Sequence, residues 1–162
     1  MKTFTKIAAV CAVLFTSLLL SGCPDGVTVS GTMPYKKIFE ITEHSSFITS
    51  PAGDECKGLM GAVEMGIAER EKAFTKSWDV EYSGKSLDEA LARADTEATA
   101  DFDAAVASLK EWQKTFEEMT ASKNYGPGSF TIAYVVRVSR DKVLRESEPI
   151  VFEYSYKKPD KK

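Results

Sequence analysis

The chain has 162 residues and a formal net charge of −3 at pH 7, with 24 acidic and 21 basic side chains. No basic stripe is visible, which argues against a nucleic-acid partner. The sequence has a single histidine and none of the H-E-x-x-H, C-x-x-C or G-x-S-x-G patterns, so no familiar metal-binding or nucleophilic motif is present.

The first 22 residues have the pattern of an export signal. Lys2 and Lys6 form a short cationic start, and an apolar run of 14 residues extends from Ile7 to Leu20. As a helix this run spans about 21 Å at ~1.5 Å per residue, short of the ~30 Å hydrocarbon core of a bilayer. The run therefore predicts a cleaved signal peptide and not a membrane-spanning helix.

The end of this segment carries a more specific pattern, Leu20-Ser21-Gly22-Cys23. It resembles the lipobox of bacterial lipoproteins, in which signal peptidase II cuts before the cysteine. The resemblance implies that residues 1–22 are removed and that Cys23 becomes a lipidated first residue, with covalent lipid as the only added group and no other cofactor. An ordinary secretory signal prefers a small-x-small cleavage site, which this stretch matches badly. Two or three acyl chains hold a protein on a membrane far longer than one.

The resemblance also predicts a location in the bacterial cell envelope. Pro24 stands where many enterobacterial lipoproteins retained in the inner membrane have aspartate, which favours the outer membrane if the organism has one. The resemblance covers residues 1–23 alone, and residues 24–162 resemble no family. Without the signal peptide the chain has 140 residues and, because two lysines leave with it, a formal charge of −5.

We divide the mature chain into a tether of residues 23–26, a single α+β domain of residues 27–156, and a basic tail of residues 157–162. Two strands are predicted before residue 49. In the first, alternate residues share one face; the second, over residues 36–48, follows a break at Met33-Pro34. The residues that define the two faces are Val27, Val29, Gly31 and Met33 for the first strand, and Phe39 and Ile41 for the second.

Ser50-Pro51 is typical of a helix start, with a serine cap and proline in the first turn. Apolar residues follow at helical spacing: Cys56, Leu59, Met60, Val63 and Ile67. We interpret Cys56 as a small buried hydrophobic residue, with a reactive thiol as the alternative. The helix also contains glycines at positions 58, 61 and 66, and each costs about 1 kcal/mol relative to alanine. Close approach to another backbone and a broken helix both remain possible explanations.

Residues 74–82 alternate as a strand, with Phe74, Trp78, Val80 and Tyr82 on one face and Gly84 as the end. Extension of the preceding helix to Trp78 is the competing interpretation.

A helix then begins at Ser86, where Glu89 completes a capping box. Its apolar stripe runs from Leu87 to Met119, and 33 helical residues would make a rod of about 50 Å. A bend near Asp95 to Asp101 would shorten this rod. The alanine-rich first half suits packing against the glycines of the earlier helix.

Asn124 to Gly128 form a turn, and two strands follow. Their apolar faces are Phe130, Ile132, Tyr134, Val136 and Val138 in the first, and Ile150, Phe152, Tyr154 and Tyr156 in the second. Pairing Val138 with Ile150 keeps apolar residues opposite each other and leaves residues 140–148 as an excursion. A tight turn over residues 140–142 is the alternative. We predict a contact loop at the excursion tip, formed by Lys142, Val143, Leu144 and Arg145.

These elements predict an α+β fold, with an antiparallel sheet of four or five strands covered by two helices in the order ββαβαββ. The leading functional hypothesis is an envelope lipoprotein that binds an envelope protein or a cell-wall component without catalysis. One alternative is a small-ligand carrier with a cavity between helices and sheet. The other is a hydrolase that uses dispersed carboxylates, although His44 has no catalytic companion at a recognisable spacing.

Overall fold

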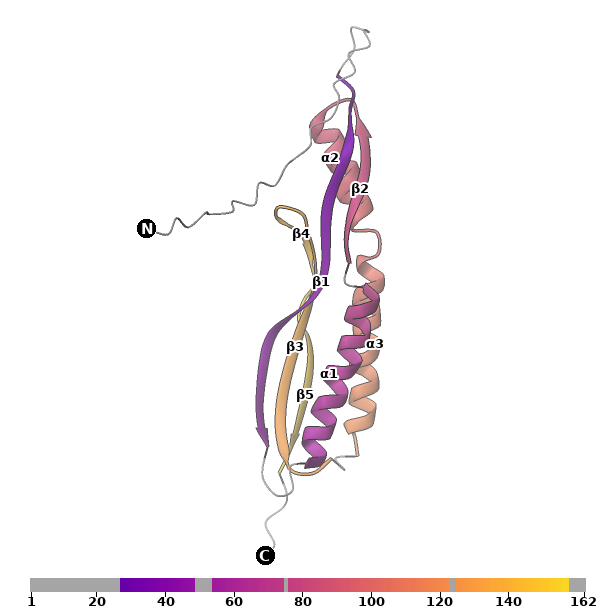
Figure 1. The fold of residues 1–162 in the computed structure, drawn as a ribbon. Helices are drawn as coiled ribbons and strands as arrows, with labels where there is room; N and C mark the ends of the chain where they lie inside the picture. Colours follow the sequence, from indigo (N-terminus) through magenta and orange to yellow (C-terminus); the bar gives the residue numbers. More distant parts are fainter. Residues whose placement is uncertain (1–26, 49–53, 75, 123–124, 158–162) are drawn as a thin grey trace, which may run out of the picture.

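The computed structural model describes residues 27–48, 54–74, 76–122 and 125–157. They form an α+β fold in which helices cover one face of a five-stranded antiparallel sheet (Figure 1). Across the sheet the strands lie in the order β2-β1-β3-β4, and β5 also pairs with β3. The elements are β1 (Val29–Ile48), α1 (Asp54–Phe74), β2 (Lys76–Gly84), α2 (Leu87–Ala98), α3 (Phe102–Thr120), β3 (Gly128–Ser139), β4 (Val143–Glu146) and β5 (Ile150–Tyr156).

The predicted fold class is confirmed. The order ββαβαββ describes the chain when the two halves of β1 count as two strands, α2 and α3 count as one bent helix, and the short β4 is an addition. Most of the described buried apolar residues form one hydrophobic cluster, in which Phe116 of α3 packs against Phe130 of β3 and Phe152 of β5.

The predicted break at Met33-Pro34 is wrong, because β1 continues through it as one strand of 20 residues. Pro34 pairs with Asp79 of β2, while pairing with β3 begins only at Lys36. At Pro34 the strand therefore has a neighbour on one side only, and a missing N–H is tolerated at such an edge.

Strand β1 changes neighbours along its length. Residues 29–37 pair with β2 and residues 36–48 pair with β3, so Lys36 and Lys37 alone have partners on both sides. We call residues 29–37 together with β2 and α2 the arm, and the remaining helices and strands the body. In Figure 1 the arm lies above most of the body, with α2 beside β2 and with α1 and α3 side by side below, while β4 rises beside the lower part of the arm.

The long predicted helix is not a continuous rod but is bent, which was one of the two interpretations of its sequence. Helix α2 ends at Ala98, and α3 begins at Phe102, whose amide donates to the Thr99 carbonyl at 3.0 Å. The Ser86 hydroxyl accepts the Glu89 amide at 3.2 Å, and the Glu89 carboxylate accepts the Lys85 amide at 2.9 Å. The capping box is thus confirmed, except that the Glu89 carboxylate accepts the amide of Lys85 and not that of Ser86.

The alanines of α2 do not pack against the glycines of α1, which corrects the prediction. Ala90 and Ala94 are fully buried, and α2 packs on β2 and β1. A Cβ on Gly84 would lie 2.7 Å from the Ala90 nitrogen, so glycine is needed where β2 ends beneath α2. Phe74 is also misplaced by the prediction, because it is the last residue of α1, whereas Trp78 lies in β2 as expected.

The start of α1 at Ser50-Pro51 falls outside the described residues, and the described helix begins at Asp54. Its predicted inner face is confirmed for Cys56 and Ile67, which are buried with Leu59 and Val63. Ile41 was predicted on the apolar face of β1 but is 54% exposed. The register with β3 is still that of Phe39 at this residue, and an irregularity follows directly, between Ile41 and Glu43.

The pairing of the last strands differs from the preferred register. Ile150 pairs with Tyr134 instead of Val138, and the presumed excursion contains strand β4, whose Arg145 pairs with Val138. The tight turn over residues 140–142 is therefore correct. The Ser147 hydroxyl accepts the Val136 amide at 2.9 Å, and the Ser147 amide donates to the Val136 carbonyl at 3.0 Å. Between Glu146, which pairs with Arg137, and Ile150, which pairs with Tyr134, the register along β3 shifts by one residue, and β5 thereby presents its apolar face to the helices.

The three glycines of α1 have different surroundings. A Cβ on Gly66 would lie 2.5 Å from Cε2 of Trp112, so close packing of α3 explains this glycine. A Cβ on Gly58 or Gly61 would meet no such neighbour within 4 Å among the described residues.

We expect Gly66→Ala to lower the free energy of unfolding by about 1–3 kcal/mol, because the Trp112 ring must move. Gly58→Ala is the matched control in the same helix, and it should raise stability by about 0.5–1 kcal/mol through helix propensity and a less flexible unfolded chain. Chemical denaturation of both variants measures the two effects. A Gly66→Ala protein as stable as Gly58→Ala would contradict the packing assigned to Trp112.

Candidate functional site

A mainly apolar pocket with a volume of about 370 Å³ lies at the end of the sheet where β1 and β5 finish and β3 begins. We call it the end pocket. Its most prominent residue is Phe47, whose ring lines the pocket while the residue is 66% exposed. The full lining is Phe47, Pro127, Gly128, Ser129, Ser155, Tyr156 and Lys157.

Strand pairing brings these residues together. Phe47 of β1 pairs with Ser129 of β3, which pairs in turn with Ser155 of β5, and Gly128 pairs with Tyr156. Gly128 has a φ of +150°, and a Cβ there would lie 2.9 Å from Sγ of Cys56. Glycine is therefore required at this position, both for the backbone conformation and for the approach of α1.

Cys56 lies behind this wall of the pocket. It is fully buried, and burial raises the pKa of its thiol, which keeps the group protonated and weakly nucleophilic. The interpretation as a small buried hydrophobic residue is confirmed. Lys157 adds one cation to the pocket lining, and residues 158–162 of the predicted basic tail lie outside the described residues.

The predicted contact loop divides into two parts in the structure. Lys142 and Val143 are exposed at the tip of the β3–β4 hairpin. Leu144 instead packs against the hydrophobic core, and the Arg145 guanidinium lies 2.7 Å from the Asp103 carboxylate and 4.3 Å from the centre of the Phe102 ring. Arg145 therefore attaches the hairpin to α3 and Leu144 attaches it to the core, while Lys142 and Val143 are free to form the predicted contact surface.

A second group of residues, absent from the sequence predictions, joins arm and body. We call Tyr35, Lys37, Asp95, Asp101 and Arg140 the junction cluster. Lys37 is only 2% exposed; its ammonium lies 3.7 Å from the Asp101 carboxylate and 5.6 Å from the Trp78 ring centre. A buried ammonium needs such partners because it has lost its hydration.

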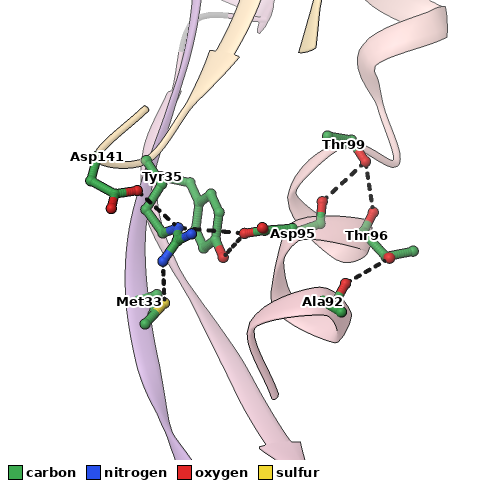
Figure 2. A network of polar contacts seen from close by, with 8 residues as sticks. Met33, Tyr35, Ala92, Asp95, Thr96, Thr99 and Asp141 are labelled. Atoms are coloured by element: carbon green, nitrogen blue, oxygen red, sulfur yellow. Dashed lines mark hydrogen bonds and ion pairs between the residues drawn. The ribbon is translucent and has the colours of Figure 1, made fainter. Parts of the chain in front are cut away.

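Figure 2 shows the other side of the junction cluster, where Tyr35 and Asp95 point toward each other. The Tyr35 hydroxyl donates to Oδ1 of Asp95 at 2.8 Å, and Nε of Arg140 lies 3.4 Å from the same oxygen. Tyr35, Lys37 and Phe39 alternate along β1 and share its inward face. The sequence does not indicate which carboxylate a lysine at such an inward position would contact.

The described residues contain no group of three or more histidine, cysteine, aspartate or glutamate side chains able to hold a metal ion. His44 lies 3.5 Å from Glu64, and both side chains are nearly half exposed. Glu81 and Glu97 line a shallow pocket on the arm but are solvent-exposed, whereas a glycosidase acid needs a desolvated environment.

Compared with known proteins, the chain matches no protein-family model, no curated protein sequence and no solved structure. None of the helices in the described ranges has the length and apolar character needed to span a membrane.

The junction cluster gives a pH-dependent prediction. Burial, followed by the hydrogen bond to Asp95, raises the pKa of Tyr35 above its ordinary value. A phenol with a higher pKa in the folded than in the unfolded chain stabilises the fold at neutral pH, and this contribution falls as the pH rises above about 10. We expect Tyr35→Phe to be less stable than wild type at pH 7, by about 1–2 kcal/mol.

Above pH 10 the stability of Tyr35→Phe should decline less steeply with pH than that of wild type. Denaturant unfolding at a series of alkaline pH values measures both slopes. Equal slopes would mean that Tyr35 ionises as readily in the folded chain as in the unfolded one.

Proposed function

We propose that this protein is a lipid-anchored envelope lipoprotein that binds a partner protein without catalysis, with the end pocket as its contact site. The observation that carries the proposal is the end pocket itself, an apolar hollow that leaves the ring of Phe47 largely exposed to solvent. Exposed aromatic side chains beside an apolar pocket are typical of protein contact sites.

The position of the end pocket supports this role. Phe47 is near the end of β1, whereas the predicted lipid on Cys23 precedes the start of the same strand. Twenty strand residues at ~3.3 Å each extend about 66 Å, so Phe47 lies far from the start of β1. An anchor at one end and a pocket at the other would present the pocket away from the membrane that holds the lipid.

The alternatives have less support. A carrier needs a cavity between the helices and the aromatic face of the sheet, but there Phe116, Phe130 and Phe152 are buried against one another. A carboxylate hydrolase needs a desolvated acid in a cleft, and the exposed Glu81 and Glu97 do not provide one. The junction cluster contains more deeply buried polar groups, but these groups are paired with one another.

The proposal is tested by placing a photoreactive benzoyl-phenylalanine at position 47 and irradiating intact cells. The matched control has the same group at Met65 on α1, which is similarly exposed at 69%. We expect a discrete crosslinked protein from position 47 and none from position 65. The same experiment with Cys23→Ala should release the protein from the membrane fraction and abolish the crosslink.

Three results would each count against a different part of the proposal. An unmodified Cys23 thiol, or a retained signal peptide, in the mass spectrum of the native protein would remove the lipid anchor. Equal crosslinking from positions 47 and 65 would remove the end pocket as the contact site. Crosslinking from position 47 to glycan instead of protein would identify a cell-wall component as the partner and reject a protein.

A further inference from the structure

The strand that pairs with β1 changes at the same level of the molecule as the helix that covers the sheet. Only Lys36 and Lys37 of β1 are paired with both β2 and β3, and α2 gives way to α3 between Ala98 and Phe102. Figure 1 shows the arm and the body as two successive parts of an elongated molecule that meet at this level. Few backbone hydrogen bonds therefore hold the arm in place, and side chains at the boundary must supply the rest.

Arg140 is the side chain that reaches from the body to two elements of the arm. It lies in the turn between β3 and β4, and its Nε is 3.4 Å from Oδ1 of Asp95 on α2. Its Nη1 is 3.5 Å from Sδ of Met33 on the arm half of β1. The Arg140 side chain is only 13% exposed, so these contacts are largely shielded from water.

Asp95 connects this arginine to the strand beneath. The oxygen that faces Arg140 also accepts the hydroxyl proton of Tyr35 at 2.8 Å, which ties α2 to β1 (Figure 2). Nε of Arg140 is buried and has no hydrogen-bond partner in the described structure. The Arg140 side chain is thus attached to the arm mainly by charge, and its loss would leave the internal contacts of the arm intact.

We propose that Arg140 is a latch, which couples the opening of the arm to that of the body. With the latch in place, arm and body open together in global unfolding. Without it, the arm opens as a separate unit, because the backbone pairing shared by the two parts is limited to Lys36 and Lys37. Proteins commonly open in such units, which coincide with supersecondary motifs.

The test is amide hydrogen exchange of the full chain, followed by mass spectrometry, for wild type and Arg140→Met. Methionine keeps most of the volume of the side chain and removes the charge. We expect peptides from β2 and α2 to exchange about tenfold faster in Arg140→Met, while those from α3 and β5 change less than twofold. The matched control is Arg145→Met, which removes an arginine of the same hairpin that pairs with Asp103 on α3. Its arm peptides should exchange as in wild type.

Equal acceleration in arm and body would show that Arg140 stabilises the whole chain and would overturn the latch. Unchanged exchange in the arm would overturn it as well. If Arg140→Met does not fold, the exchange of arm and body peptides is measured in Asp95→Asn instead. Asparagine at this position still accepts the Tyr35 hydrogen bond but no longer attracts Arg140.

Discussion

The fold depends on burying the ammonium of Lys37 where β1 passes from one neighbour to the next. At this point the strand must lie beneath the helical layer, and its side chains alternate, so Tyr35, Lys37 and Phe39 all point into the core. Asp101 and the face of the Trp78 ring compensate the charge. Asp101 is the last residue before α3, so this ion pair lies where the helical layer changes from α2 to α3.

This constraint accounts for the division of the molecule into arm and body. The break at Thr99 to Asp101 lets α2 follow β2 and α3 follow β5. Extension of the sheet along β1 then places the end pocket far from the start of the strand. The proposed division of labour, with the lipid at one end and partner contact at the other, rests on this length.

The sequence predicted the elements with strong alternation or helical spacing. The faces of β3 and β5 were correct because five and four consecutive alternate residues are apolar. Errors arose where strand pairing overrode a local signal. Proline breaks most strands, but Pro34 lies where β1 has one neighbour. The contacts of Ser147 with Val136 change the register of the following strand on β3, which hydrophobicity alone could not determine. The end pocket joins Phe47, Gly128 and Tyr156, which are distant in sequence, so only the strand register could assemble it.

A double-mutant cycle between Lys37 and Asp101 tests most directly whether burial of this charge governs the fold. The free energy of unfolding is measured for wild type, Lys37→Met, Asp101→Asn and the double variant. Asp101→Asn should destabilise wild type by about 1–3 kcal/mol, because the buried ammonium loses one of its charged partners. The same substitution should have little effect in the Lys37→Met background, which leaves a coupling energy of at least about 1 kcal/mol. Additive effects, with a coupling energy below about 0.3 kcal/mol, would contradict the account.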